Sequence, residues 1–145
     1  MKKIFIVEDD SDILYGLSDI FSSNDYEVEL SDSTEELDDL LKRIKKFKPE
    51  VIILDLVLPR LEGLDIIKKI KEDDDTSNTE IFIFTDLSDE DSKSRSVGLG
   101  ANYYFLKSEF DIYTFSSRVM RIMGRADEDN KKEESEEDDS GLVMD

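Results

Sequence analysis

The sequence predicts an α/β fold in which helices cover both faces of a parallel sheet. Four apolar runs of about four residues are widely spaced along the chain, at Ile4–Val7, Val51–Leu54, Ile81–Phe84 and Tyr103–Leu106. Continuous apolar runs of this length are typical of strands buried on both faces. The segments between them carry apolar residues at helical spacing. This alternation predicts five strand–helix units with right-handed crossovers.

The second strand of this series has a different pattern. Tyr26, Val28 and Leu30 alternate with Glu27 and Glu29. Alternation buries one face and exposes the other. The pattern therefore predicts a half-exposed strand at an edge of the sheet.

Five helices are predicted, four of them from clear apolar stripes. The stripes span residues 13–21, 37–47, 64–70 and 112–122. Between Ser88 and Gly100 only Val97 and Leu99 are apolar, which predicts a short and mobile fourth helix.

Two helix starts have capping signals. Asp10 or Ser11 can cap the first helix. Ser33 and Glu36 have the spacing of a capping box before the second.

The composition divides the chain into a domain of residues 1–125 and a tail of residues 126–145. The tail holds ten acidic and two basic residues without periodicity, which predicts a disordered acidic extension. Its apolar residues Leu142–Met144 leave a docking motif as an alternative.

Charge and composition exclude several functions. The net charge of −19 argues against direct nucleic-acid binding. The chain has no cysteine and no histidine, which removes thiolate chemistry, zinc held by histidine and the commonest general base. No apolar run approaches the roughly 18 residues of a membrane span. We therefore expect a soluble cytoplasmic protein that does not bind membranes.

Polar residues at the carboxyl ends of the strands form a candidate site. Glu8 and Asp9 follow the first strand, Asp55 the third and Thr85 the fourth, while Lys107 follows the fifth. Each alone also fits a structural role, such as a helix cap or a surface lysine. Because the carboxyl ends of parallel strands share one edge, we expect these groups to meet. Crowded carboxylates repel unless a cation joins them, and carboxylate oxygens suit Mg²⁺.

Such a site favours phosphoryl transfer to a carboxylate. A carboxylate can attack phosphorus to give an acyl phosphate, and the reaction needs mainly positioning and charge neutralisation. Asp55 is the predicted acceptor, with Mg²⁺, Lys107 and Thr85 each holding one phosphoryl oxygen. A phosphohistidine donor would have to be another protein, because this chain has no histidine.

Four segments resemble the response-regulator receiver domain of two-component signalling. They are residues 4–10, 51–63, 84–85 and 100–107. The resemblance covers about residues 1–125 and implies a flavodoxin-like, doubly wound (βα)5 fold with strand order 2-1-3-4-5. The resemblance implies a stand-alone receiver like the chemotaxis regulators.

The resemblance also implies roles for individual residues. Glu8 and Asp9 match the family's metal-binding acidic pair. Asp55 matches the phosphorylated residue, and Val57 would offer its backbone carbonyl to Mg²⁺ or Mn²⁺.

Three further positions match the parts of the family's switch. Thr85 matches the switch hydroxyl, Lys107 the phosphate-binding lysine and Tyr104 the switch aromatic. The implied donor is a histidine kinase or a histidine phosphotransfer protein, and the implied output is phosphorylation-dependent protein binding or a phosphorelay. The chain would then be a signalling domain rather than an enzyme, with intrinsic phosphotransfer and autodephosphorylation chemistry.

Three departures from the family pattern affect these expectations. Asp86 stands where the family has a small residue; it either opposes an incoming phosphate or points into solvent. Ser108 replaces the proline after Lys107, so the peptide bond there is trans or the lysine is displaced. Val57 and Leu87 are apolar, and we hypothesise that they hinder the water that removes the phosphoryl group.

Three alternatives follow from the same residues. A pseudo-receiver that binds proteins without phosphorylation is supported by Asp86 and Ser108. A haloacid-dehalogenase-type phosphohydrolase is disfavoured, because Val57 stands where a second Asp is needed. A flavin-binding relative is disfavoured by the missing phosphate-binding loop after the first strand.

Overall fold

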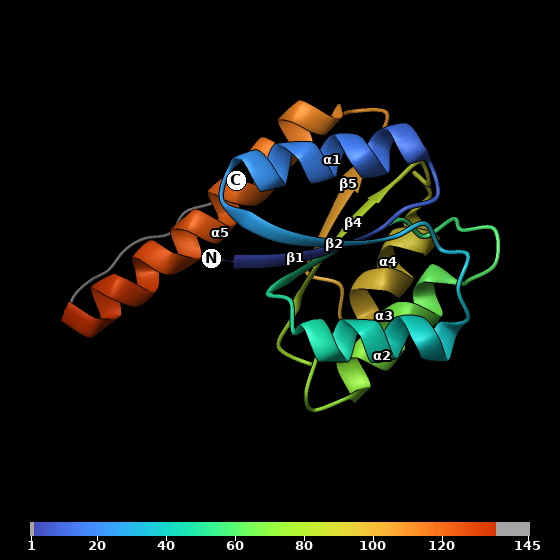
Figure 1. Cartoon of the computed structure of the whole chain (residues 1–145), viewed down its shortest axis with the longest axis horizontal. Coiled ribbons are helices and arrows are strands. Elements are labelled where there is room, and N and C mark those ends of the chain that lie inside the picture. The colour runs from blue at the N-terminus through green and yellow to red at the C-terminus, as the bar shows by residue number, and fades with distance from the viewer. Residues whose placement is uncertain (1, 136–145) are drawn as a thin grey trace.

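Strands and helices alternate along the computed structural model, which describes the backbone of residues 2–135 and the side chains up to residue 124. The strands are β1 (Lys2–Val7), β2 (Tyr26–Ser31), β3 (Val51–Leu54), β4 (Glu80–Thr85) and β5 (Tyr103–Leu106). The helices are α1 (Ser11–Ser23), α2 (Leu37–Phe47), α3 (Gly63–Glu72), α4 (Glu90–Gly98) and α5 (Ile112–Ser135) (Figure 1). Over these described residues, no helix has both the length and the apolar character needed to cross a bilayer.

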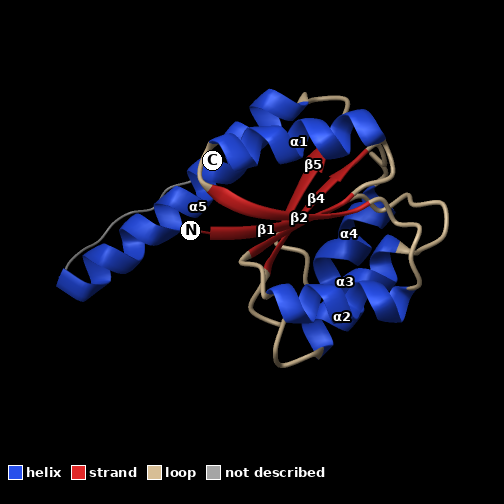
Figure 2. Ribbon diagram, in the orientation of Figure 1, coloured by secondary structure: helices blue, strands red, loops and turns tan. Residues whose placement is uncertain are grey.

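The five strands form one parallel sheet in the order β2-β1-β3-β4-β5. Helices α1 and α5 cover one face, and α2, α3 and α4 cover the other (Figure 2). The predicted doubly wound fold, the strand order and the edge position of β2 are therefore confirmed. This topology brings the carboxyl ends of β1 and β3 side by side.

The two faces of the sheet carry two separate hydrophobic cores. In β1, Phe5 and Val7 pack toward α2 and α3, whereas Ile4 and Ile6 pack toward α1 and α5. All four side chains are fully buried. Burial on both sides explains why the central strands have continuous apolar runs rather than alternation.

The predicted cap of α1 is confirmed. The Asp10 carboxylate accepts hydrogen bonds from the backbone N–H groups of Asp12 at 3.0 Å and Ile13 at 3.2 Å. These bonds satisfy donors that the first helical turn leaves unpaired.

The predicted capping box of α2 is wrong. The helix begins at Leu37 after Glu36, which makes no capping hydrogen bond and instead pairs with Arg60 at 3.1 Å. Ser33 has a φ of 69°, and its buried hydroxyl has no hydrogen-bond partner. Glu35 is held by Arg43 at 2.7 Å. The two glutamates before α2 therefore form ion pairs with Arg43 and Arg60 and do not cap the helix.

Helix α5 continues to Ser135 and projects beyond the sheet (Figure 1). Residues 126–135 are therefore helical, where the sequence predicts a disordered tail. Acidic residues stand four positions before Lys131 and Lys132, a spacing that stabilises helices. The division into domain and tail at residue 125 stays a prediction, and Leu142–Met144 lie outside the described residues.

Candidate functional site

The candidate site residues are held by backbone hydrogen bonds that extend the sheet beyond its strands. The N–H of Asp55 donates to the carbonyl of Val7 at 3.2 Å, and the N–H of Lys107 donates to the carbonyl of Thr85 at 2.8 Å. Each residue therefore follows its strand in register with the neighbouring strand. The rigid sheet, rather than a mobile loop, fixes where these side chains begin.

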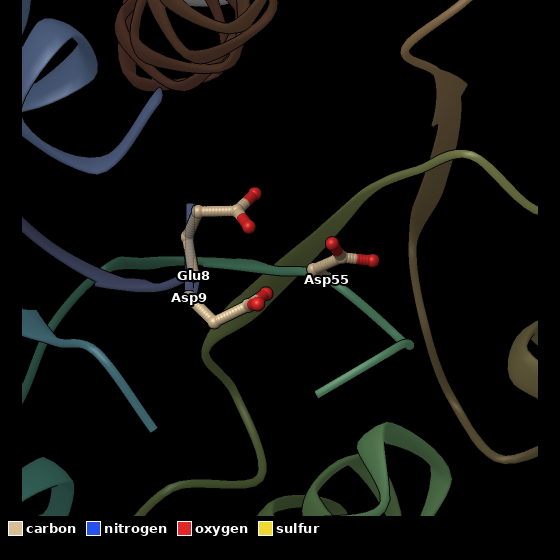
Figure 3. Close-up of side chains that lie close together, drawn as sticks. All are labelled: Glu8, Asp9 and Asp55. Carbon is tan, nitrogen blue, oxygen red and sulfur yellow. The ribbon is translucent and has the colours of Figure 1, made fainter. Parts of the chain in front are cut away.

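Three carboxylates from β1 and β3 converge at this edge, as Figure 3 shows. Glu8, Asp9 and Asp55 each offer one oxygen, and these oxygens lie within 4.8 Å of one another. Glu8 and Asp55 are buried, whereas Asp9 is exposed. Two buried carboxylates and one exposed carboxylate form an acidic pocket that opens toward solvent.

Lys107 joins the two buried carboxylates. Its Nζ lies 2.7 Å from Oδ2 of Asp55 and 2.9 Å from Oε1 of Glu8, and its side chain is only 12% exposed. Burial lowers the pKa of Lys107, but the hydrogen bonds to Asp55 and Glu8 outweigh it and raise the pKa above its ordinary value. Lys107 is therefore charged at neutral pH.

The proline-free sequence after Lys107 does not displace this lysine. Residues 2–135 contain no cis peptide bond, so the bond between Lys107 and Ser108 is trans. Lys107 still reaches Asp55. Of the two expectations, the trans bond is confirmed and the displaced lysine is wrong.

The charge balance of the pocket leaves room for a cation. Burial raises the pKa of Glu8 to about 7, because hydrogen bonds from Lys107 and from the N–H of Asp10 offset it only in part. A single lysine therefore does not fully compensate the clustered carboxylates. A hard divalent cation such as Mg²⁺ or Mn²⁺ fits these oxygen donors.

Val57 lies next to this pocket. Its N–H donates to Oδ1 of Asp55 at 3.1 Å, and its side chain is 53% exposed. The role of its carbonyl as a metal ligand stays a prediction.

Thr85 and Tyr104 hold the same peptide segment. The Thr85 hydroxyl, which is fully buried, accepts a hydrogen bond from the N–H of Leu87 at 3.4 Å. The Tyr104 hydroxyl donates to the carbonyl of Leu87 at 2.7 Å. This backbone role of Leu87 could not be predicted from the sequence, because main-chain contacts do not depend on residue type. Asp86, which lies between Thr85 and Leu87 in the sequence, is exposed.

The comparisons with known proteins agree with this geometry. A family model described as "Response regulator receiver domain" matches residues 4–116. This chain belongs to the response regulator receiver family. Receiver domains bind Mg²⁺ or Mn²⁺ at an acidic pocket, and this receiver has such a cluster in Glu8, Asp9 and Asp55.

Solved structures of other receivers share the fold. The signal receiver domain of a DNA-binding response regulator from Colwellia psychrerythraea is 25% identical, with 86% of this chain and 99% of that chain covered and a TM-score of 0.73. The Vibrio cholerae chemotaxis protein CheY4 is 24% identical, with 83% of this chain and 98% of that chain covered and a TM-score of 0.73. The Mn²⁺-bound form of the response regulator Rcp1 is 22% identical, with 82% of this chain and 91% of that chain covered and a TM-score of 0.70.

Proposed function

We propose that this receiver accepts a phosphoryl group on Asp55 from a histidine kinase or a histidine phosphotransfer protein, in a Mg²⁺-dependent reaction in the cytoplasm. The observation that carries the proposal is the position of the Asp55 carboxylate. It lies buried, within the acidic cluster and 2.7 Å from the Lys107 ammonium group. A buried lysine, together with a divalent cation that the clustered carboxylates would hold, suits a site that receives an anionic group and neutralises it.

In the proposed step, one oxygen of Asp55 attacks the phosphorus of a phosphohistidine. The new O–P bond forms as the P–N bond breaks, and the imidazole takes a proton as it leaves. Glu8, Asp9, Asp55 and the Val57 carbonyl would hold a divalent cation, which would supply positive charge for the phosphoryl oxygens. Lys107 turns from its carboxylate partners to a second phosphoryl oxygen, and this movement keeps its charge paired.

The proposed signal starts at Thr85. When its hydroxyl turns to a phosphoryl oxygen, it gives up the hydrogen bond from Leu87, whose carbonyl is held by Tyr104. The segment between β4 and α4 is thereby linked to the chemistry at Asp55. A protein that prefers the altered segment would read the signal, or the phosphoryl group would pass to another protein in a relay. The proposal includes no direct contact with DNA or with a membrane.

The second candidate is a pseudo-receiver that binds its partner without phosphorylation. Asp86, exposed and directly after Thr85, still favours it, because a further carboxylate at this edge opposes an incoming phosphate. Ser108 does not favour the pseudo-receiver, because Lys107 reaches Asp55 although no proline follows the lysine.

The proposal is tested by the mass of the intact protein after incubation with Mg²⁺ and a high concentration of acetyl phosphate. We expect a gain of one phosphoryl group in the parent, and no gain in the Asp55→Asn variant or with EDTA. The parent's failure to gain mass at both low and high salt would favour the pseudo-receiver. A gain that persists in Asp55→Asn would place the acceptor elsewhere.

A further inference from the structure

The edge of the sheet that carries the site is strongly acidic. Five loops follow the strands at this edge; with the first two residues of α1 and of α4 they span residues 8–12, 32–36, 55–62, 86–91 and 107–111. Together they hold fifteen Asp and Glu residues and two basic residues. This set of loops, the acidic rim, thus carries most of the chain's net charge of −19.

The two basic residues of the rim already have partners. Lys107 is mostly buried between Glu8 and Asp55. Arg60 pairs with Glu36 at 3.1 Å. All five loops lie within the described residues, and neither of their cations is left without a carboxylate. An approaching molecule therefore meets a surface of uncompensated negative charge.

Exposed lysines lie away from the site, toward the opposite edge of the sheet. The second halves of α2 and α3, with the residue after α2, carry six exposed lysines: Lys42, Lys45, Lys46, Lys48, Lys68 and Lys69. Acidic residues such as Asp73, Asp74 and Asp75 also lie at that edge, and Lys45 pairs with Asp73 and Asp75, so the opposite edge is mixed in charge whereas the rim is almost wholly acidic. A surface on which one sign of charge dominates orients charged partners before contact.

This rim surrounds an acceptor that must receive an anion. Two exposed carboxylates belong to this rim close to the acceptor in the fold: Asp9, which clusters with Asp55, and Asp86, which directly follows Thr85. Like charges repel over about a Debye length, which is ~10 Å at 0.1 M salt. One bound divalent cation offsets two of the carboxylates and leaves the rim acidic.

We infer that the acidic rim selects the phosphodonor: it disfavours small phosphate anions and favours a donor protein whose phosphohistidine is surrounded by Lys and Arg. The inference rests on the proposed function and adds the chemistry of the donor to it. Cationic side chains around the histidine offset the phosphoryl charge and steer the donor onto the rim. Steering of this kind changes association rates by about 10- to 1,000-fold at low salt.

Two phosphohistidine peptides of equal length test the inference on the full chain with Mg²⁺. One has lysines on both sides of the phosphohistidine, and the other has glutamates. At about 0.02 M salt we expect the lysine peptide to transfer its phosphoryl group about tenfold faster or more. At about 0.5 M salt, where screening shortens the Debye length to a few Å, the two rates should converge.

A double variant and a matched control locate the effect. Glu62 and Asp86 are exposed rim residues whose side chains cap no helix and form no ion pair. Glu62→Gln with Asp86→Asn should reduce the preference for the lysine peptide several-fold. Glu27→Gln with Asp74→Asn changes the net charge equally at the opposite edge and should leave the preference intact.

The outcomes separate this inference from the proposed function. Equal rates for the two peptides at low salt, or an equal loss of preference in both double variants, would overturn the inference alone. Labelling of the protein by acetyl phosphate at low salt, with no phosphoryl transfer from either peptide, would also overturn the inference alone. If no donor labels the protein at any salt concentration, the proposed function fails and this inference fails with it.

Discussion

At the level of single residues, the site depends on Lys107. Its ammonium group is the positive charge shared by two buried carboxylates, at 2.7 Å from Asp55 and 2.9 Å from Glu8. Removing one partner of a buried ionic contact leaves the others uncompensated, which costs more than the contact contributes.

Lys107→Ala should therefore lower the free energy of unfolding by about 3 kcal/mol when no divalent cation is present. Mg²⁺ should recover more of this stability in the variant than it adds to the parent, because the carboxylates then depend on it. Urea unfolding with EDTA or Mg²⁺ measures both effects. Lys46→Ala, at an exposed lysine of α2, is the control and should change stability by less than about 0.5 kcal/mol. Equal losses in the two variants would contradict the account.

Val57 gives a second prediction at this scale. Its side chain is 53% exposed beside Asp55 and cannot orient an attacking water by hydrogen bonding. Val57→Asn should speed the loss of the phosphoryl group about fivefold, the effect of one hydrogen bond of ~1 kcal/mol in the transition state. Val97→Asn, at a similarly exposed valine of α4, is the control. An unchanged dephosphorylation rate in Val57→Asn would remove the hypothesis.

Residue types predicted which groups meet, but not how they are joined. Glu8, Asp9, Asp55 and Lys107 could be placed together because their strands end at one edge. The link through Leu87 could not be predicted, because it uses backbone atoms that every residue has.

At the level of secondary structure elements, the start of α3 is tightly constrained. A Cβ atom on Gly63 would lie 2.6 Å from Cα of Leu56, the residue after Asp55. Backbone cannot give way as a flexible side chain can. Glycine at this position therefore lets α3 pack against the segment that carries the phosphoacceptor.

Gly63→Ala should destabilise the fold by about 2 kcal/mol through overpacking. Gly98→Ala is the matched control, because a Cβ at the end of α4 would meet nothing within 4 Å. That substitution should instead stabilise the fold by about 0.5–1 kcal/mol. Urea unfolding of both variants measures the difference, and a similar change in both would contradict the packing argument.

The elements also show where sequence patterns suffice. The bounds of β3 and β5 equal the predicted apolar runs, because burial on both faces gives a continuous signal. The start of α2 was mispredicted, because Arg60 pairs with Glu36, the glutamate that the capping box would use. Contacts between residues far apart in sequence override local signals of this kind.

At the level of the whole molecule, topology produces the site. The order β2-β1-β3-β4-β5 places the carboxyl end of β1 beside that of β3, and β4 lies next to both β3 and β5. The acidic pair, the acceptor, the hydroxyl and the lysine thus come from four neighbouring strands. The same arrangement gathers acidic loops at the edge that carries the site.

The most direct test of the central claim is to locate the phosphoryl group within the chain. Borohydride reduces an aspartyl phosphate to homoserine, which peptide mass spectrometry can assign to a single residue. After phosphorylation with Mg²⁺ and a phosphohistidine donor, we predict homoserine at position 55 and nowhere else. Homoserine at Asp9 or Asp86, or phosphorylation that leaves Asp55 unmodified, would contradict it.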